Sequence, residues 1–218
     1  VTSYWLGTAH DVIVKHESGY MQGTKLVPAY FAETPSAAAV VTALPATWSP
    51  LSRGSFPAGN LGGVGGNVYV GMLPEWDTVY LTSQASSTYK AVVFNGYAAG
   101  RYGFHYRDET TNRAPLLSDH PTLNIKPEEG GWTTTPNASG TASDGWSLDH
   151  QPNIGWLAYL VTGRRYFLDE VQLCAATNIL FISSSTRESG SALAKSEEVP
   201  TTRGVAWYWR MLAQAAAI

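Results

Sequence analysis

The sequence of 218 residues contains one cysteine, Cys174. A single cysteine excludes an internal disulfide and any zinc site built from several thiolates. Because Cys174 lies within an apolar helical pattern, we interpret it as a core residue rather than a nucleophile. His10, His16 and Glu17 lack the spacing of a metal-binding motif, so the sequence predicts no metal site.

Charge is also scarce. Charged residues make up 14% of the sequence, against roughly 25% in typical soluble domains. The net charge of −3 gives no basic excess for nucleic-acid binding, and no apolar run is long enough to span a bilayer. We therefore expect neither nucleic acid as a partner nor a membrane-spanning segment. The low charge predicts that other copies of the chain, a partner or a larger parent chain cover part of the surface.

The chain lacks a phosphate loop. Residues 61–66 are rich in glycine, but no Lys-Ser/Thr pair follows them and no clear strand precedes them. No cofactor is therefore expected. They belong to a stretch of prolines, glycines and small polar residues at 46–67, which predicts a long loop. Residues 1–70 as a whole are expected to form an irregular segment that packs on the helices, with one short helix within residues 36–44.

What the sequence has in abundance is helical periodicity, most clearly in residues 149–181. Ile154, Leu157 and Val161 recur at helical spacing, and Gly163 then supplies the left-handed residue with which many helices end. The apolar period resumes after Gly163, so a hairpin of two helices is predicted. Nearly every face of both helices is apolar or aromatic, which predicts burial between neighbouring hairpins.

The helix starts are predicted from capping residues. Asp149 is expected to cap the first helix of this hairpin, with Pro152 in its first turn. Residues 74–99 repeat the pattern weakly, with Pro74 opening one helix, Ser86 or Ser87 capping the next and Gly100 ending it. A final helix is expected from Thr201 or Thr202, with one apolar stripe of Val205, Trp209, Leu212 and Ala216.

These patterns predict a mainly α protein of stacked antiparallel helical hairpins, with long irregular loops and a little β. Residues 71–218 are expected to form the hairpin domain, with a long loop inserted at about residues 101–148. Within this insertion, residues 102–106 alternate like a short strand. The polar and charged residues 107–113 that follow indicate a turn.

Two stretches, within residues 150–170 and 203–213, resemble hairpins of (α/α)-toroid carbohydrate-active enzymes, which include glycoside hydrolases and polysaccharide lyases. The strings are Tyr159-Leu160-Val161-Thr162-Gly163, Tyr166-Phe167-Leu168-Asp169-Glu170 and Arg203-Gly204-Val205-Ala206-Trp207. Residues 73–76 and 105–109 also resemble long, uncharacterised bacterial proteins. The toroid resemblance implies a partial α/α toroid and a polysaccharide or oligosaccharide as substrate. A closed toroid needs more hairpins than the pattern supplies, so the ring is partial, or copies of the chain complete it, or the resemblance is to hairpin stacking in general.

Two carbohydrate chemistries fit the polar residues at the element ends. In a hydrolase, one carboxylic acid protonates the leaving oxygen while a second carboxylate activates water or attacks; Asp108, Glu109 and Asp149 are the candidates. In a lyase, a Tyr or His removes a proton beside a uronic carboxylate and an Arg stabilises the anion. The predicted catalytic residues are His105, Tyr106, Asp108, Asp149 and His150, and the predicted substrate-binding residues are Arg107, Trp76 and Trp156.

Each of these residues also has a structural interpretation. Asp149 fits a helix cap, His150 fits a hydrogen bond to a neighbouring loop, and residues 107–109 fit an ordinary charged turn. Whether the chain is an enzyme therefore stays open. The alternative function is a structural or interaction subunit of a bacterial or viral assembly. The compartment also stays open, between an extracellular or periplasmic location and a virion or similar assembly.

Overall fold

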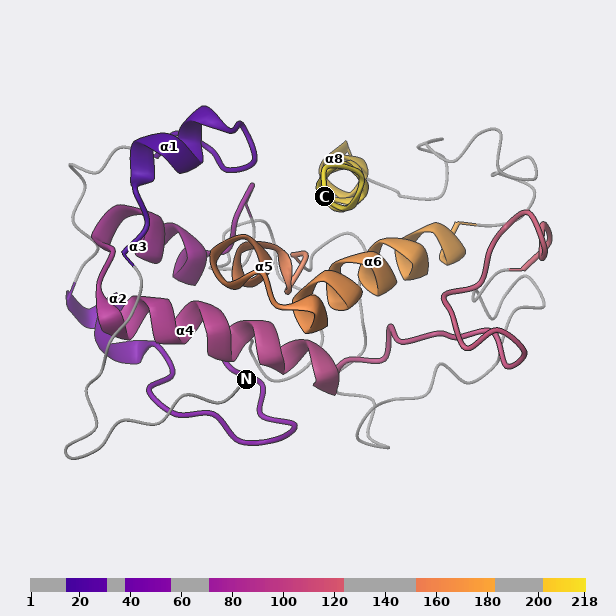
Figure 1. Cartoon of the computed structure of the whole chain (residues 1–218), viewed down its shortest axis with the longest axis horizontal. Helices are drawn as coiled ribbons and strands as arrows, with labels where there is room; N and C mark the ends of the chain where they lie inside the picture. The colour runs from indigo at the N-terminus through magenta and orange to yellow at the C-terminus, as the bar shows by residue number, and fades with distance from the viewer. Residues whose placement is uncertain (1–14, 31–37, 56–70, 124–151, 183–201) are drawn as a thin grey trace.

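The structure is a computed structural model, and it describes residues 15–30, 38–55, 71–123, 152–182 and 202–218 (Figure 1). These residues are mainly helical, as predicted, and none of them lies in a β-strand. Within the described ranges, no helix is both long enough and apolar enough to cross a membrane.

The first hairpin consists of α3 (Glu75–Ser83) and α4 (Ser86–Tyr97), with the 3-10 helix η1 (Ala98–Arg101) after it. Pro74 precedes α3 as predicted, and Gln84, at a φ of 53°, forms the left-handed end of that helix. The predicted serine cap of α4 is wrong, because Ala85 occupies the capping position and Ser86 is the first helical residue. Gly100 does not end the helix either, since α4 tightens into η1 after Tyr97.

The second hairpin consists of α5 (Trp156–Thr162) and α6 (Arg165–Leu180). Gly163 ends α5 with a φ of 63°, which confirms the predicted stop. The predicted start is wrong, because α5 begins at Trp156 and Pro152 lies before the helix rather than in its first turn. The backbone already turns at Gly155, where a Cβ atom would lie 2.6 Å from the carbonyl oxygen of Phe167. This approach to α6 fixes where α5 begins.

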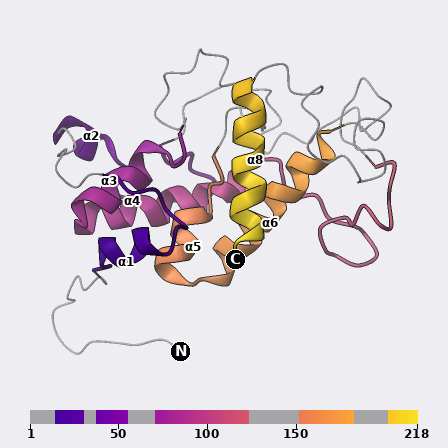
Figure 2. The same ribbon diagram turned by 90° about the horizontal axis from the view of Figure 1, so that it is seen from above.

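The C-terminal helix α8 (Thr202–Ala216) packs against α6 and lies across it (Figure 2). The predicted apolar stripe of Val205, Trp209, Leu212 and Ala216 is displaced by one residue. Tyr208 and Met211 are buried, whereas Trp209 is 49% exposed and Ala216 is exposed too. Val205 and Leu212 lie at the margin of the contact with Ile182 and Tyr208. Met211, rather than the predicted Leu212, packs beside Cys174 of α6. Its flexible side chain fills this space, and the contact is consistent with the observed rotation of α8.

The helices pack in chain order, with contacts from α3 to α4, α4 to α5, α5 to α6 and α6 to α8. Such packing is expected of stacked hairpins, whereas a partial toroid stays a prediction. The described N-terminal residues, 15–30 and 38–55, include two short helices, α1 (Ser18–Gly23) and α2 (Ala38–Ala43). The second confirms the predicted short helix, while α1 was not predicted. Met21 and Val27 belong to the same core cluster as residues of α3 to α6.

The predicted strand at residues 102–106 is wrong. Tyr102 and Phe104 are both buried, and the amide of Phe104 donates to the carbonyl of Tyr102 at 3.0 Å. The carbonyl of Phe104 accepts a hydrogen bond of 2.6 Å from the hydroxyl of Thr177 in α6. The segment is therefore held by a helix side chain instead of a neighbouring strand.

The two hairpins approach each other closely at Gly96 of α4. A Cβ atom there would lie 2.7 Å from the Cβ of Ala158 and 2.8 Å from a ring carbon of Phe167. Both neighbours are buried, so neither moves aside easily. The missing side chain at residue 96 thus allows α4 to pack on α5 and α6.

We predict that Gly96→Ala lowers the free energy of unfolding by about 1–3 kcal/mol, the usual cost of overpacking a core. Gly23→Ala is the matched control, because nothing lies within 4 Å of a Cβ at that position in α1. Chemical denaturation followed by circular dichroism measures both. Equal stability of the two variants would contradict the close packing of the hairpins.

A second prediction concerns Asp77, which is buried in the first turn of α3. Burial raises the pKa of its carboxyl group well above 3.8. The unfolded chain therefore loses this proton at a lower pH than the folded chain, and stability falls as the pH rises above 3.8 toward the folded pKa. Asp77→Asn is expected to raise the unfolding midpoint at pH 7 and to lose that advantage at low pH. An unchanged unfolding midpoint at pH 7 would show that other interactions offset the cost of burying the Asp77 carboxylate.

Candidate functional site

The loop after η1 lies beside the C-terminal end of α6 (Figure 1). The two enclose a cavity of about 310 Å³. This size lies at the lower end of the range for small-molecule sites. Most of the polar residues in its lining lie at positions 106–110, which include three of the predicted site residues. The lining residues are Tyr106, Arg107, Asp108, Glu109, Thr110, Pro115, His120, Leu123 and Leu180.

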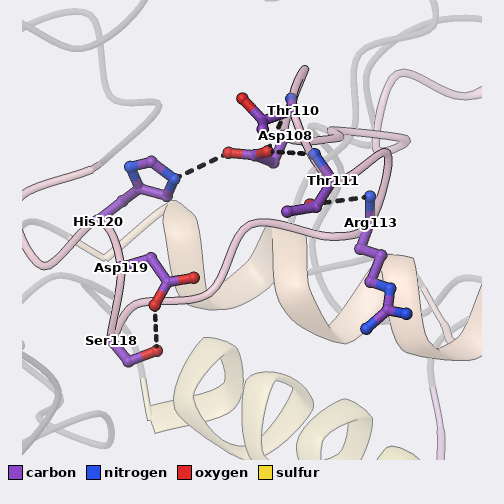
Figure 3. Close-up of polar contacts among 7 residues, drawn as sticks. All are labelled: Asp108, Thr110, Thr111, Arg113, Ser118, Asp119 and His120. Atoms are coloured by element: carbon purple, nitrogen blue, oxygen red, sulfur yellow. Dashed lines mark hydrogen bonds and ion pairs between the residues drawn. The ribbon is translucent and has the colours of Figure 1, made fainter.

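Asp108 organises the loop. Its Oδ1 accepts hydrogen bonds from the backbone amides of Thr110 at 2.9 Å and Thr111 at 2.7 Å (Figure 3). An aspartate that accepts amides two and three residues later stabilises a tight turn. The amide of Asp108 donates to the carbonyl of Arg113 at 2.8 Å and its carbonyl accepts from Asn112, which closes the turn. The predicted turn at residues 107–113 is thus confirmed.

The second oxygen of Asp108 faces His120. The distance from Asp108 Oδ2 to His120 Nε2 is 2.9 Å, and Figure 3 shows the two side chains pointing toward each other. The amide of Thr111 and the imidazole of His120 together lower the pKa of the Asp108 carboxyl group. The carboxylate is then an acceptor, so His120 Nε2 carries the hydrogen of this contact. A histidine oriented by a carboxylate in this way has the arrangement of a general base.

His105 lies elsewhere. Its Nε2 is 2.6 Å from Oε2 of the buried Glu170 in α6, and its Nδ1 is 2.9 Å from the carbonyl oxygen of Tyr102. Because the carbonyl is only an acceptor, Nδ1 carries a hydrogen, and Nε2 contacts the carboxylate of Glu170. Both ring nitrogens are therefore engaged, and His105 does not line the cavity. This geometry assigns it a structural tie between the loop and α6.

Tyr106 and Arg107 do line the cavity, as does Asp108, so the structure brings three of the predicted site residues together. Burial raises the pKa of the Tyr106 phenol, and its catalytic role stays a prediction. Arg107 is exposed and donates to the carbonyl of Asn112 at 3.1 Å. Asp149 and His150 lie outside the described residues.

The two predicted stacking residues are buried. Trp76 and Trp156 are each 2% exposed, and they belong to two different core clusters. The indole of Trp156 donates to the carbonyl of Leu26 at 3.2 Å. Trp156 also borders a separate cavity of about 430 Å³ between the loop after α1 and α8. Neither ring lines the cavity at Asp108, and Trp76 presents no free face to a sugar.

His120 is the residue of this site that the sequence analysis did not assign. It lies in the string Asp119-His120-Pro121, which is the one local signal for it. No side-chain pattern indicates that a histidine twelve residues after Asp108 returns to it. Among the described residues, no group of three or more His, Cys, Asp or Glu side chains has an arrangement that could hold a metal ion.

We predict that His105→Phe destabilises the fold by about 1–3 kcal/mol, because it removes a hydrogen-bond partner of a buried carboxylate. Glu170→Gln is the control, since its amide can donate to Nε2 of a neutral His105. It is therefore expected to be less destabilising. Thermal unfolding of both variants measures the difference. A fully stable His105→Phe protein without catalytic activity would assign His105 to catalysis instead.

Comparisons with known proteins give no relative from which to assign the site. No family model matches the chain, and neither the curated proteins nor the solved structures contain a match. The assignment of this site depends on its own geometry.

Proposed function

We propose that the chain is a carbohydrate-active module, a hydrolase or lyase that acts on a polysaccharide in the cavity at Asp108 and His120. The observation that carries this proposal is the contact of 2.9 Å between the two side chains in the wall of a ligand-sized cavity. The lining offers a carboxylate, an imidazole, a guanidinium and apolar surface, and a sugar presents hydroxyl groups and an apolar ring face to match them.

The role of each residue follows from its hydrogen bonds. His120 Nδ1 accepts a proton, either from water in a hydrolysis or from the carbon beside a uronic carboxylate in an elimination. Asp108 keeps the imidazole in the tautomer that leaves Nδ1 free and stabilises the imidazolium that forms. The turn at Thr110 and Thr111 holds the carboxylate in place, so the dyad needs little rearrangement when substrate binds.

The other carboxylate of the cavity, Glu109, has an exposed side chain next to Asp108. In a hydrolysis it is the available group to protonate the leaving oxygen. In an elimination, the carbon–oxygen bond breaks as the carbon–carbon double bond forms, and the leaving oxygen takes a proton from Glu109 or from water. Both reactions balance without a cofactor.

A second candidate function, an interaction subunit of an assembly, is favoured by the outer face of α8. Trp209 is 49% exposed there, and the neighbouring alanines on the same face, Ala206, Ala213 and Ala216, are exposed as well. An apolar helix face of this kind is typical of a surface that contacts another chain. It lies on a helix that does not line the cavity at Asp108, so the two functions are separable by mutation.

The test is turnover on a panel of oligosaccharides, with reducing ends and unsaturated products measured separately. We expect His120→Ala to lower kcat by about 10²–10⁴-fold, the usual contribution of a general base. Asp108→Asn keeps an oxygen for the amides of Thr110 and Thr111 but places an amide nitrogen beside His120. It is expected to lower kcat without unfolding the loop.

Asp119→Asn is the matched control. Asp119 precedes His120 but bonds to the hydroxyl of Ser118 at 3.0 Å, away from the dyad (Figure 3). Its activity should equal that of the wild type. If no substrate of the panel is turned over, and the protein forms a regular oligomer that Trp209→Ser disrupts, the assembly function replaces the proposed one.

A further inference from the structure

A second cavity, of about 450 Å³, adjoins the first. Arg107 lines both cavities. The second cavity lies between the turn at residues 107–113 and the outer face of α6. Its lining residues are Arg107, Asn112, Arg113, Ala114, Leu116, Arg165, Asp169, Gln172 and Leu173.

The lining of this second cavity is positively charged. It contains three arginines, Arg107, Arg113 and Arg165, and one acid, Asp169. The nearest approach of Arg165 to Asp169 is 3.7 Å between exposed side chains, a pair that contributes little and leaves most of the guanidinium available. The whole chain carries a net charge of −3, so this concentration of positive charge is a local feature.

The turn at Asp108 positions two of the three arginines. The hydrogen bond of 2.8 Å from the amide of Asp108 to the carbonyl of Arg113 brings residues 107 and 113 to the same end of the turn. Figure 3 shows the Arg113 side chain extending away from Asp108 and His120, so it does not neutralise the carboxylate of the dyad. The third arginine comes from the start of α6. The backbone positions of these arginines are thus fixed by a closed turn and a helix.

We infer that this cavity binds an oxyanion substituent, a carboxylate or a sulfate group, of the polysaccharide whose backbone occupies the cavity at His120. The inference depends on the proposed function and specifies its substrate class as an anionic polysaccharide. Guanidinium groups bind carboxylate and sulfate oxygens through paired, charge-assisted hydrogen bonds. The amides of Asn112 and Gln172 supply further donors and acceptors for the hydroxyl groups of the same sugar.

The test compares binding of three oligosaccharides of equal length, a uronate, a sulfated one and a neutral one, by isothermal titration calorimetry. We expect the wild type to bind at least one anionic oligosaccharide tenfold or more tightly than the neutral one. Its affinity should fall as salt is added. The double variant Arg113→Gln/Arg165→Gln should lose about tenfold or more of that affinity, the effect of one or two charge-assisted hydrogen bonds. Whether the uronate or the sulfated oligosaccharide responds identifies the anion.

Arg164→Gln is the matched control. It precedes Arg165 and removes the same charge, but its guanidinium donates to the hydroxyl of Tyr97 at 2.6 Å and does not line the cavity. Its affinity should equal that of the wild type. Equal binding of neutral and anionic oligosaccharides, or an equal loss in Arg164→Gln, would overturn the inference.

The outcome also separates the inference from the proposed function. Binding that depends on Arg113 and Arg165 without turnover of any substrate supports the anion site and contradicts the catalytic role of His120. Turnover of a neutral polysaccharide that depends on His120 and is unchanged in the double variant supports the proposed function and contradicts the anion site.

Discussion

Two hydrogen bonds to α6 hold the segment after η1, and the candidate site depends on them. The hydroxyl of Thr177 donates to the carbonyl of Phe104, and Glu170 contacts the imidazole of His105. Thr177 and Glu170 are both buried, where hydrogen bonds are stronger than in water and the loss of one partner is costly. Because residue 106 enters the cavity directly after this anchor, the position of the turn at Asp108 is set by α6 rather than by the loop itself.

The helices were the part of the fold that the sequence predicted well. Apolar residues at helical spacing identified α3 to α6 and α8, and Gly163 marked the break between α5 and α6 correctly. The errors lie where distant residues decide. The start of α5 depends on the carbonyl of Phe167 beside Gly155, and the rotation of α8 depends on the fit of Met211 beside Cys174. Neither contact can be recognised from the local spacing of apolar residues.

The candidate site was likewise predicted from the sequence only in part. The turn at Asp108 follows from the short-range habit of aspartate to accept amides two and three residues later, so the sequence predicts it. The alternation of residues 102–106 indicated a strand, but a carboxylate in α6, 65 residues from His105, directs that side chain away from the cavity. His120 lines the cavity instead. The polar loop around His120 has no periodic pattern, so the sequence spacing did not predict its contact with Asp108.

Arg107 lines both cavities, and this shared residue has a thermodynamic consequence. An anion that repositioned the Arg107 guanidinium in one cavity would also change the wall of the other, and the two proposed binding sites would then be energetically linked. Linkage is reciprocal: whatever factor a sugar in one compartment applies to the affinity for an anion in the other, the anion applies to the sugar. A polymer that fills both at once would then bind with a free energy different from the sum of its two halves.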